Sequence, residues 1–201
     1  MNEFIYNTDT IVNTAAFPQK QHFLGYELCD QNDTALTTQI HDFDFSEDDL
    51  NPEDLASRLI ATSKFHKVYG IAANQCGLYY RVLVAGANDD WVAFFNPEIT
   101  WVSDEIILLE ETDLSNMALI IPVKRPKSIV IKYQDYNGEF KETKVDGLTA
   151  RIIQQAVDRL NGIDFKTKVS KLVLQRANTS LNKKVKKFVR THAIMKKRGK
   201  K

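Results

Sequence analysis

Cysteine and histidine are scarce in this chain, and long hydrophobic runs are missing. Its 201 residues include two cysteines, Cys29 and Cys76, and four histidines. Two cysteines without a CxxC spacing give no disulfide framework, which suits a reducing compartment. No apolar run approaches the roughly 18 residues of a membrane span, and the first ten residues lack the basic and apolar regions of a signal peptide. We therefore expect an intracellular protein that is not secreted by a signal peptide and does not contact a membrane.

The charges that are present are distributed unevenly. The chain has 27 basic and 26 acidic residues, and ten of the basic residues, with no acid, fall in residues 182–201. The other 181 residues hold 17 basic against 26 acidic residues, a net charge of −9. With 43% hydrophobic residues the body is long enough for one globular domain with a real core. The sequence thus predicts a domain over residues 1–181 and a basic tail over residues 182–201.

The first third of the chain predicts an arm followed by a helix. Residues 1–40 mix short apolar pieces with polar loops, which favours an irregular N-terminal arm with one or two short strands. The acidic stretch 41–54 leads into a helix that Asn51 caps and Pro52 opens. We expect that helix to reach about Phe65.

The middle of the chain is rich in strand signals. Asn-Gly at 137–138 predicts a hairpin, and Pro97 predicts the end of the strand before it. The expected strands, rich in β-branched and aromatic residues, are 81–85, 91–95, 105–109, 128–133 and 139–145. Several antiparallel strands between two helices favour an α+β fold.

A second helix is predicted over residues 150–162. Its apolar residues recur at helical spacing and should face the core: Leu148, Ile152, Ile153, Val157 and Leu160. Gln155 and Arg159 lie four apart on another side, the spacing at which HExxH metalloenzymes place two histidine ligands. Ala156 stands where such enzymes have their general-base glutamate.

Three segments in order resemble the motifs of the peptide deformylase family. VYGIAANQ (68–75), ETDLS (111–115) and QQAVDR (154–159) are similar to GxGLAAxQ, EGCLS and QHExDH. This family consists of metal-dependent hydrolases that remove formyl from the N-terminal methionine of new bacterial proteins. The resemblance covers about residues 50–175 and implies antiparallel β-sheets around a central helix, followed here by a C-terminal basic helix or tail.

The resemblance assigns the family's metal ligands and base to different residue types in this chain. Its cysteine ligand corresponds to Asp113, its two histidines to Gln155 and Arg159, and its glutamate base to Ala156. We therefore expect no metal, no cofactor and no catalytic residue. The counterparts of Gln75 and Leu114 help to hold the developing oxyanion in the family. A vestigial pocket is predicted at Gly70, Gln75, Asp113, Leu114, Gln155, Ala156 and Arg159.

Two hypotheses concern individual side chains in this pocket. Asp113 and Arg159 replace ligands of one ion, so they can pair directly and balance each other's charge. The alternative is that they changed independently and point to solvent. Cys76, beside Gln75, is expected to be a small packed residue without thiol chemistry.

The tail carries the predicted partner surface, and this surface is basic: Lys183, Lys184, Lys186, Lys187, Arg190, Lys196, Lys197 and Arg198. Protein partners in an assembly are the first expectation. Nucleic acid is also open, and the ribosome is implied by the family resemblance. A tail that only keeps the protein in solution is the other alternative.

The functional hypothesis is a catalytically inactive deformylase-like protein. It would serve as a structural or binding subunit, either a bacteriophage particle component or a ribosome-associated factor, in the bacterial cytoplasm or the assembled particle. The alternative is a divergent metal-dependent peptide deformylase that removes formyl from N-terminal formyl-methionine.

Overall fold

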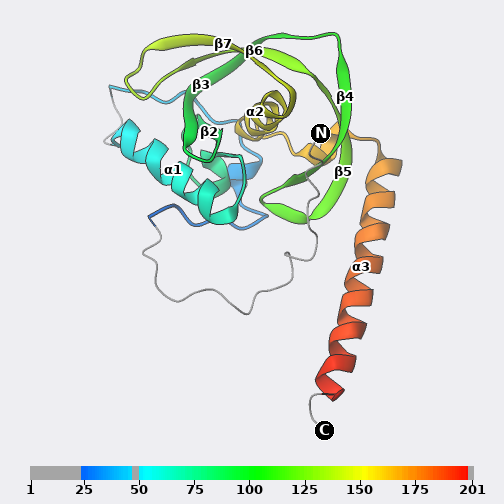
Figure 1. Ribbon diagram of the computed structural model, residues 1–201. Helices are drawn as coiled ribbons and strands as arrows, with labels where there is room; N and C mark the ends of the chain where they lie inside the picture. Colours follow the sequence, from blue (N-terminus) through cyan, green and yellow to red (C-terminus); the bar gives the residue numbers. More distant parts are fainter. Residues whose placement is uncertain (1–23, 47–49, 199–201) are drawn as a thin grey trace.

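Two antiparallel sheets and three α-helices make up the protein, in a computed structural model that describes residues 24–46 and 50–198 (Figure 1). The predicted α+β fold is confirmed. Helix α2 (Gly147–Leu160) lies in the middle, between the larger sheet and the smaller one. The expectation of antiparallel sheets around a central helix is therefore confirmed too.

The larger sheet has five strands in the order β1-β2-β3-β6-β7, and every neighbouring pair is antiparallel. Its strands are β1 (Gly70–Ala72), β2 (Val82–Ala87), β3 (Asp90–Val102), β6 (Ser128–Gln134) and β7 (Phe140–Asp146). The Asn-Gly hairpin joins β6 to β7, as predicted, and Gly138 takes the left-handed φ of 81° that the turn requires.

The prediction that β3 ends at Pro97 is wrong. The strand continues to Val102 through a bulge, since Phe95 pairs with Gln134 but Glu98 pairs with Lys132. Proline has no N–H to donate, and a bulge is a place where the ladder does not need one. Asn96 stabilises the irregular backbone, because its side chain accepts from Phe43 N at 2.6 Å and donates to Phe43 O at 2.9 Å.

The smaller sheet pairs β4 (Ile106–Asp113) with β5 (Asn116–Pro126). The sequence predicts only the first part of β4 and misses β5, because β5 interrupts its apolar residues with prolines and a Lys-Arg pair. Alternate residues of β5 are nevertheless buried, as period-two packing on one face requires.

Helices α1 (Pro52–His66) and α2 cover opposite faces of the larger sheet. The predicted start of α1 is confirmed, with the Asn51 side chain accepting from Glu53 N and Asp54 N. Leu55 and Leu59 of α1 pack against Val82 and Val84. The cluster on the other face packs α2 residues against strand residues that point to that side of the sheet. The strand residues include Leu83, Ala85, Phe94, Ile129 and Ile131, and the α2 residues are Ala150, Ile153, Ala156, Val157 and Leu160.

Leu148 is the exception among the residues expected on the buried face of α2. It is 48% exposed, because it lies in the first helical turn and the apolar cluster beneath α2 begins only at Ala150. The helix starts with Asp146, whose side chain accepts from Gly147 N at 2.9 Å and from Ser128 Oγ at 2.7 Å.

The described part of the N-terminal arm is irregular, as expected, with one short 3-10 turn (Thr34–Leu36). The one or two short strands predicted for the arm do not occur between residues 24 and 40, and residues 1–23 lie outside the described part of the chain. The arm is joined to the domain by backbone hydrogen bonds, because Cys29 N donates to Gln75 O and Ile40 N donates to Leu160 O.

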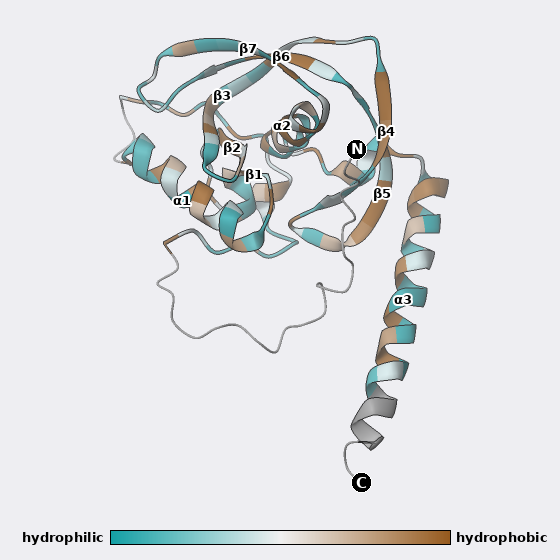
Figure 2. Ribbon diagram, in the orientation of Figure 1, coloured by the Kyte–Doolittle hydropathy of each residue, from teal (hydrophilic) through white to brown (hydrophobic). Residues whose placement is uncertain are grey.

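Helix α3 (Lys171–Arg198) projects from the body beside β5 (Figure 1). It crosses the boundary at residues 181 and 182 that the charge distribution predicts. Figure 2 shows mixed colours along this helix, whereas β4 and β5 have longer brown stretches. Within the described ranges, no helix has both the length and the apolarity needed to cross a bilayer.

A core truncation in α2 tests whether this helix holds the sheets together. We expect Ile153→Ala to lower the free energy of unfolding by about 2–5 kcal/mol, because Ile153 is fully buried against the larger sheet. Leu148→Ala on the same helix is the matched control and should change it by less than about 1 kcal/mol. Equal losses in urea unfolding of the two variants would contradict the assigned packing.

Candidate functional site

The last turn of α2 meets the end of β4 in a buried ion pair. Arg159 Nε donates to Asp113 Oδ2 at 2.8 Å, and the two side chains are 4% and 1% exposed. The hypothesis that these residues pair directly is confirmed, and the alternative of two solvent-facing side chains is wrong. A guanidinium and a carboxylate without contact to water are tolerated only when each satisfies the other.

A second contact from α2 holds the same strand end. Gln155 Nε2 donates to Thr112 O at 2.8 Å. Asp113 Oδ1 in turn accepts from Ser115 N at 2.8 Å, which closes the turn between β4 and β5. The four-residue spacing of Gln155 and Arg159 therefore places both side chains on consecutive residues of β4.

Arg159 has further partners that neutralise and fix it. Its Nη1 lies 3.7 Å from Asp164 Oδ2. Its backbone oxygen accepts from Asn74 Nδ2 at 2.6 Å, and the same Asn74 amide also donates to Ala35 O at 2.9 Å. One buried amide thus joins the end of α2 to the short helix that carries Gln75.

Gln75 lies in that short helix, a 3-10 turn (Ala73–Cys76) directly after β1. It is 5% exposed, and its Oε1 accepts from Ala72 N at 3.0 Å. With the oxygen engaged in this way, the amide nitrogen is the end of the side chain left for a ligand carbonyl. Leu114, on the β4–β5 turn, is half-buried and packs against the α1-side cluster, the apolar residues between α1 and the larger sheet.

Gly70 and Ala156 bring the elements of the site close together. A Cβ on Gly70 would lie 2.5 Å from Ile152 Cγ2 and 2.9 Å from Val84 O, so only glycine lets α2 approach β1 this closely. Ala156 is 5% exposed and belongs to the apolar cluster under α2. A methyl group there offers no proton acceptor.

A larger buried ion cluster surrounds Glu111, two residues before Asp113 on β4. Arg125 binds it through two bonds, Nε to Oε1 at 2.6 Å and Nη2 to Oε2 at 3.0 Å. Arg151 of α2 donates to the same carboxylate and to Ile107 O. Arg125 also reaches Asp158 Oδ2 at 2.7 Å, so the cluster joins β4, β5 and α2.

The two arginines of this cluster have shifted pKa values of opposite sign. Burial by itself lowers the pKa of Arg125, but its hydrogen bonds to Glu111 and its attraction to Glu111 and Asp158 raise it overall. Burial lowers the pKa of Arg151, and its contact with Glu111 offsets this only in part. Both remain cationic at neutral pH, as arginine does in proteins.

Cys76 packs against the α1-side cluster, which confirms its predicted role as a packed residue. Burial, with a smaller contribution from the neighbouring Cys29, raises the pKa of its thiol to about 12. A thiol with such a pKa is protonated at neutral pH and is a poor nucleophile.

The residues at the ligand-equivalent positions do not fit a divalent metal ion. Asp113 has both oxygens engaged, and the amide nitrogen of Gln155 already donates to a backbone carbonyl. The Arg159 guanidinium cannot ligate a cation and would repel it. No group of three His, Cys, Asp or Glu side chains suited to a metal occurs in residues 24–46 and 50–198.

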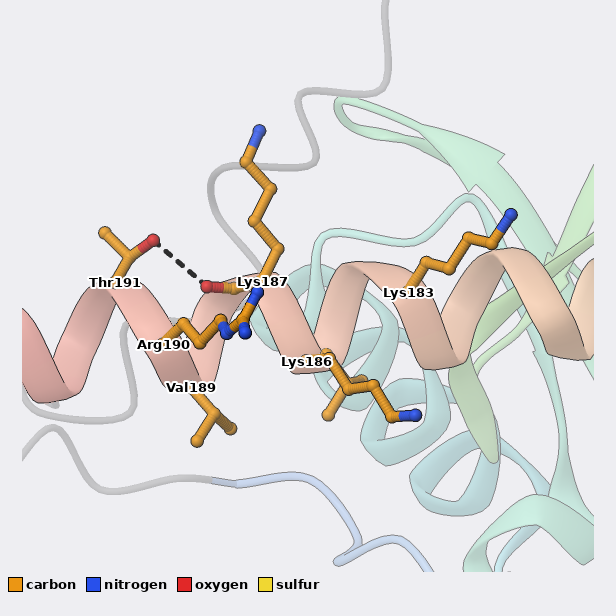
Figure 3. A pocket seen from close by; sticks show the side chains of 7 residues that line it. Lys183, Lys186, Lys187, Val189, Arg190 and Thr191 are labelled. Atoms are coloured by element: carbon orange, nitrogen blue, oxygen red, sulfur yellow. Dashed lines mark hydrogen bonds between the residues drawn. The ribbon is translucent and has the colours of Figure 1, made fainter.

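The basic residues predicted to bind a partner lie apart from this site, on the projecting half of α3. An open hollow along this half of the helix is bordered by Lys183, Val185, Lys186, Lys187, Val189, Arg190 and Thr191, and the labelled side chains point in different directions from the helix (Figure 3). Lys196, Lys197 and Arg198 continue the helix backbone, but their side chains are outside the described part.

Comparison with known proteins places the chain in a family. The model of the polypeptide deformylase family matches residues 26–175. The chain belongs to the peptide deformylase family. A protein of Dictyoglomus turgidum named "Peptide deformylase" is 37% identical over 129 residues, covering 64% of this chain and 78% of that protein.

Other relatives agree with this assignment. A Rickettsia conorii protein named "Peptide deformylase-like" is 30% identical over 148 residues, covering 72% of this chain and 79% of that protein. The crystal structure of peptide deformylase from Thermotoga maritima superimposes with a TM-score of 0.68 at 30% identity, covering 73% of this chain and 98% of that one.

These findings correct the functional hypothesis. The expectation of a catalytically inactive structural or binding subunit is contradicted, because the relatives are named as deformylases and none of those described above is named as a structural subunit. The expectation that the chain is not an enzyme falls for the same reason. A bacteriophage particle component has no support among these relatives. The alternative, a divergent deformylase, is the better-supported hypothesis.

Several site residues were missed in the sequence. Arg151 lies four residues before Gln155 and eight before Arg159, so polar residues at this spacing along an apolar helix could have revealed it. Asn74 gave no such signal, because its contacts with Ala35 and Arg159 join elements that are distant in sequence. Asp164 and Ser115 lie close in sequence to the residues they contact, but no periodic pattern marks them. Ser115 Oγ and Asn74 Oδ1 are buried and have no hydrogen-bond partner among the described residues.

Removing one partner of the Arg159–Asp113 pair should be costly. We expect Arg159→Leu to lower the free energy of unfolding by about 3–5 kcal/mol, because it leaves a buried carboxylate uncompensated. The double variant Arg159→Leu/Asp113→Asn should lose less than the sum of the two single variants.

The control is Arg58→Leu, which removes an exposed i,i+4 pair with Asp54, an exposed hydrogen bond to Leu24 O and a contact with the Tyr26 ring. These contacts are exposed, so the loss should be about 1–2 kcal/mol, smaller than in Arg159→Leu. Urea unfolding at pH 7 measures all four variants. Two outcomes would show that the pair does not support this site. One is a double variant whose loss of unfolding free energy equals the sum of the two single losses, and the other is a loss in Arg159→Leu no greater than in Arg58→Leu.

Cys76 should resist alkylation in the folded protein. With a pKa of about 12 the thiol is almost entirely protonated at pH 8, so we expect iodoacetamide to modify it at least about 100-fold more slowly than a free cysteine. The rate should rise with pH up to that pKa. Mass spectrometry of the native protein, with the urea-unfolded protein as control, measures this, and equal rates in both would contradict it.

Proposed function

We propose that this chain acts as a peptide deformylase of divergent site chemistry, with the formylated N-terminus of a peptide as its substrate. The observation that carries this proposal is the family match, which spans the strands, the β4–β5 turn and α2. The reaction class is hydrolysis of a formamide, which releases formate and a free amino terminus. The proposal implies the bacterial cytoplasm, where newly made formylated chains occur.

Groups that can bind a carbonyl support this proposal. The Gln75 amide is oriented by Ala72 N, which leaves its nitrogen as the free donor. The β4–β5 turn carries Leu114, whose family counterpart contributes a backbone N–H to the oxyanion. Ser115 Oγ in the same turn is buried without a partner among the described residues and can bond a substrate or a water molecule.

In this proposal, the residues at the ligand-equivalent positions hold the β4–β5 turn in place. Arg159 and Gln155 attach the last two residues of β4 to α2. A metal ion shared by a strand ligand and two helix ligands would fix the same turn. Here a salt bridge and an amide bond fix it instead, so the oxyanion donors keep their place although the donor set does not suit an ion. We assign no step to a metal.

Formate release from N-formyl-Met-Ala-Ser tests the proposal. We expect turnover by the full chain, and a decrease in kcat/KM of about 100-fold in Gln75→Ala, because that variant lacks an oxyanion donor. Lys132→Ala, an exposed change on β6, is the matched control and should leave the rate unchanged. Metal content is measured in the same preparations by elemental analysis.

The variants also detect contamination by a host deformylase, which would give the same rate in every preparation. No release above the protein-free rate, or equal rates in wild type, Gln75→Ala and Lys132→Ala, overturns the proposal. Turnover that scales with bound zinc, iron or nickel would support the proposed reaction. It would also show that our conclusion that these positions do not fit a metal ion is wrong.

A further inference from the structure

The side chain of Asn74 joins the turn that carries Gln75 to the end of α2. Asn74 is fully buried and directly precedes Gln75 in the 3-10 turn. Its amide nitrogen donates to Arg159 O at 2.6 Å and to Ala35 O at 2.9 Å. The turn is therefore held from two sides, by the last turn of α2 and by the N-terminal arm.

Arg159 extends this connection to the β4–β5 turn. Its guanidinium donates to Asp113 Oδ2 at 2.8 Å, and Asp113 Oδ1 closes the turn by accepting from the turn backbone at 2.8 Å. Leu114 lies within the turn that is closed in this way. The two positions proposed to bind the carbonyl oxygen, Gln75 and Leu114, are thus joined through the end of α2.

Only a side chain with two N–H groups can serve both of the backbone carbonyls that Asn74 contacts. A carbonyl oxygen accepts and cannot donate, so the nitrogen of Asn74, and not its oxygen, must face Arg159 O and Ala35 O. A leucine of similar size has no donor, and an aspartate would place a carboxylate against two carbonyl oxygens. The pair of contacts is therefore specific to asparagine among side chains of this size.

This orientation leaves the oxygen of Asn74 without a partner. Oδ1 is buried, and no described residue donates to it. A buried acceptor that has lost its hydrogen bonds to water is unfavourable, so packing alone would favour an apolar side chain here. The polar side chain is explained by what its nitrogen holds.

The side chain of Gln75 is oriented by a hydrogen bond from Ala72 N at 3.0 Å. Because this bond spans the start of the turn, the position of the Gln75 amide nitrogen follows the position of the turn backbone. Cys29 N donates to Gln75 O at 3.0 Å and restrains the same backbone from the arm. Asn74 supplies the restraint that faces α2.

We propose that Asn74 is a positioning residue, which sets the separation between the Gln75 amide and the β4–β5 turn by holding the Gln75 turn against Arg159 O. Its effect on catalysis rests on the proposed deformylase function, whereas its effect on the orientation of Gln75 does not. Donors to a developing oxyanion act in the transition state, and a small misplacement weakens them. Loss of the Asn74 contacts should therefore lower kcat and leave KM nearly unchanged.

Hydrogen exchange of the Ala72 amide reports the orientation of Gln75, because this N–H donates to Gln75 Oε1. We expect Asn74→Leu to lower the protection of this amide about 10-fold or more relative to the amides of β6. Expressing the protection relative to β6 removes the effect of a change in global stability. NMR of the full chain measures both sets of amides.

Gln154→Leu is the matched control for this measurement. Gln154 is 6% exposed, and its amide nitrogen also donates to two backbone carbonyls, Pro126 O at 3.0 Å and Ala150 O at 3.1 Å, away from the Gln75 turn. This control should leave the Ala72 ratio unchanged. Asn74→Ser keeps one donor and should have an intermediate effect, and it takes the place of Asn74→Leu if that variant does not fold.

A double-mutant cycle in the formate-release assay tests the effect on catalysis. We expect Asn74→Leu to lower kcat about 10-fold, with KM within about 2-fold of the wild-type value. Asn74→Leu combined with Gln75→Ala should lose no more than Gln75→Ala alone, because Asn74 acts through Gln75.

The outcomes separate this inference from the proposed function. An Ala72 ratio that is unchanged in Asn74→Leu, or lowered equally in Gln154→Leu, overturns the inference. Losses that multiply in the double variant also overturn it. If the wild type shows no turnover, the proposed function fails, and the Ala72 exchange alone then decides whether Asn74 positions Gln75.

Discussion

The contact between α2 and the end of β4 is the constraint on which the rest of the structure depends. It joins the two sheets, because α2 packs its apolar side on the larger sheet while Arg159 and Gln155 hold the smaller one. Buried charges at such a junction are favourable only if their geometry is satisfied. Asp113 meets this condition with one oxygen on the guanidinium and the other on the turn backbone.

The same principle organises the cluster around Glu111. Two arginines share one carboxylate there, and Asp158 supplies the second negative charge. The two clusters use residues from successive turns of α2, so the polar side of this helix is a row of charge contacts to the β4–β5 sheet. A member of the peptide deformylase family can therefore hold the β4–β5 turn in place with buried ion pairs. In this chain the residues at the ligand-equivalent positions do not suit a metal ion.

Helix α3 differs from the domain that precedes it in how it is held and in its charge. Its first half is held by apolar contacts with β5, and its second half has exposed apolar residues, among them Val185 and Phe188. The positive charge of this half offsets the negative charge of the body in the total, which is why the net charge of +1 conceals it. The distribution of charge along the chain, and not its sum, therefore distinguishes this half of α3 from the body.

Much of the fold could be predicted from local patterns. The Asn51 cap, the Asn-Gly hairpin and the helical spacing of Ile153, Val157 and Leu160 depend on neighbours a few residues apart, and all were confirmed. The extension of β3 past Pro97 could not be predicted, because a bulge depends on the partner strand. Strand β5 was missed because prolines and a Lys-Arg pair interrupt its apolar residues. The elements that bury it, α3 and the short 3-10 helix of Phe165, lie far along the chain and give no local signal.

The sequence by itself determined the family, the two helices and most of the strands of the domain, and the residue types at each ligand-equivalent position. Only the tertiary structure decided what those residues do. Asp113 and Arg159 are 46 residues apart, and a carboxylate and a guanidinium at that separation are equally consistent with solvent exposure and with pairing. Burial decides between the two, because removing both groups from water makes direct contact the only favourable arrangement.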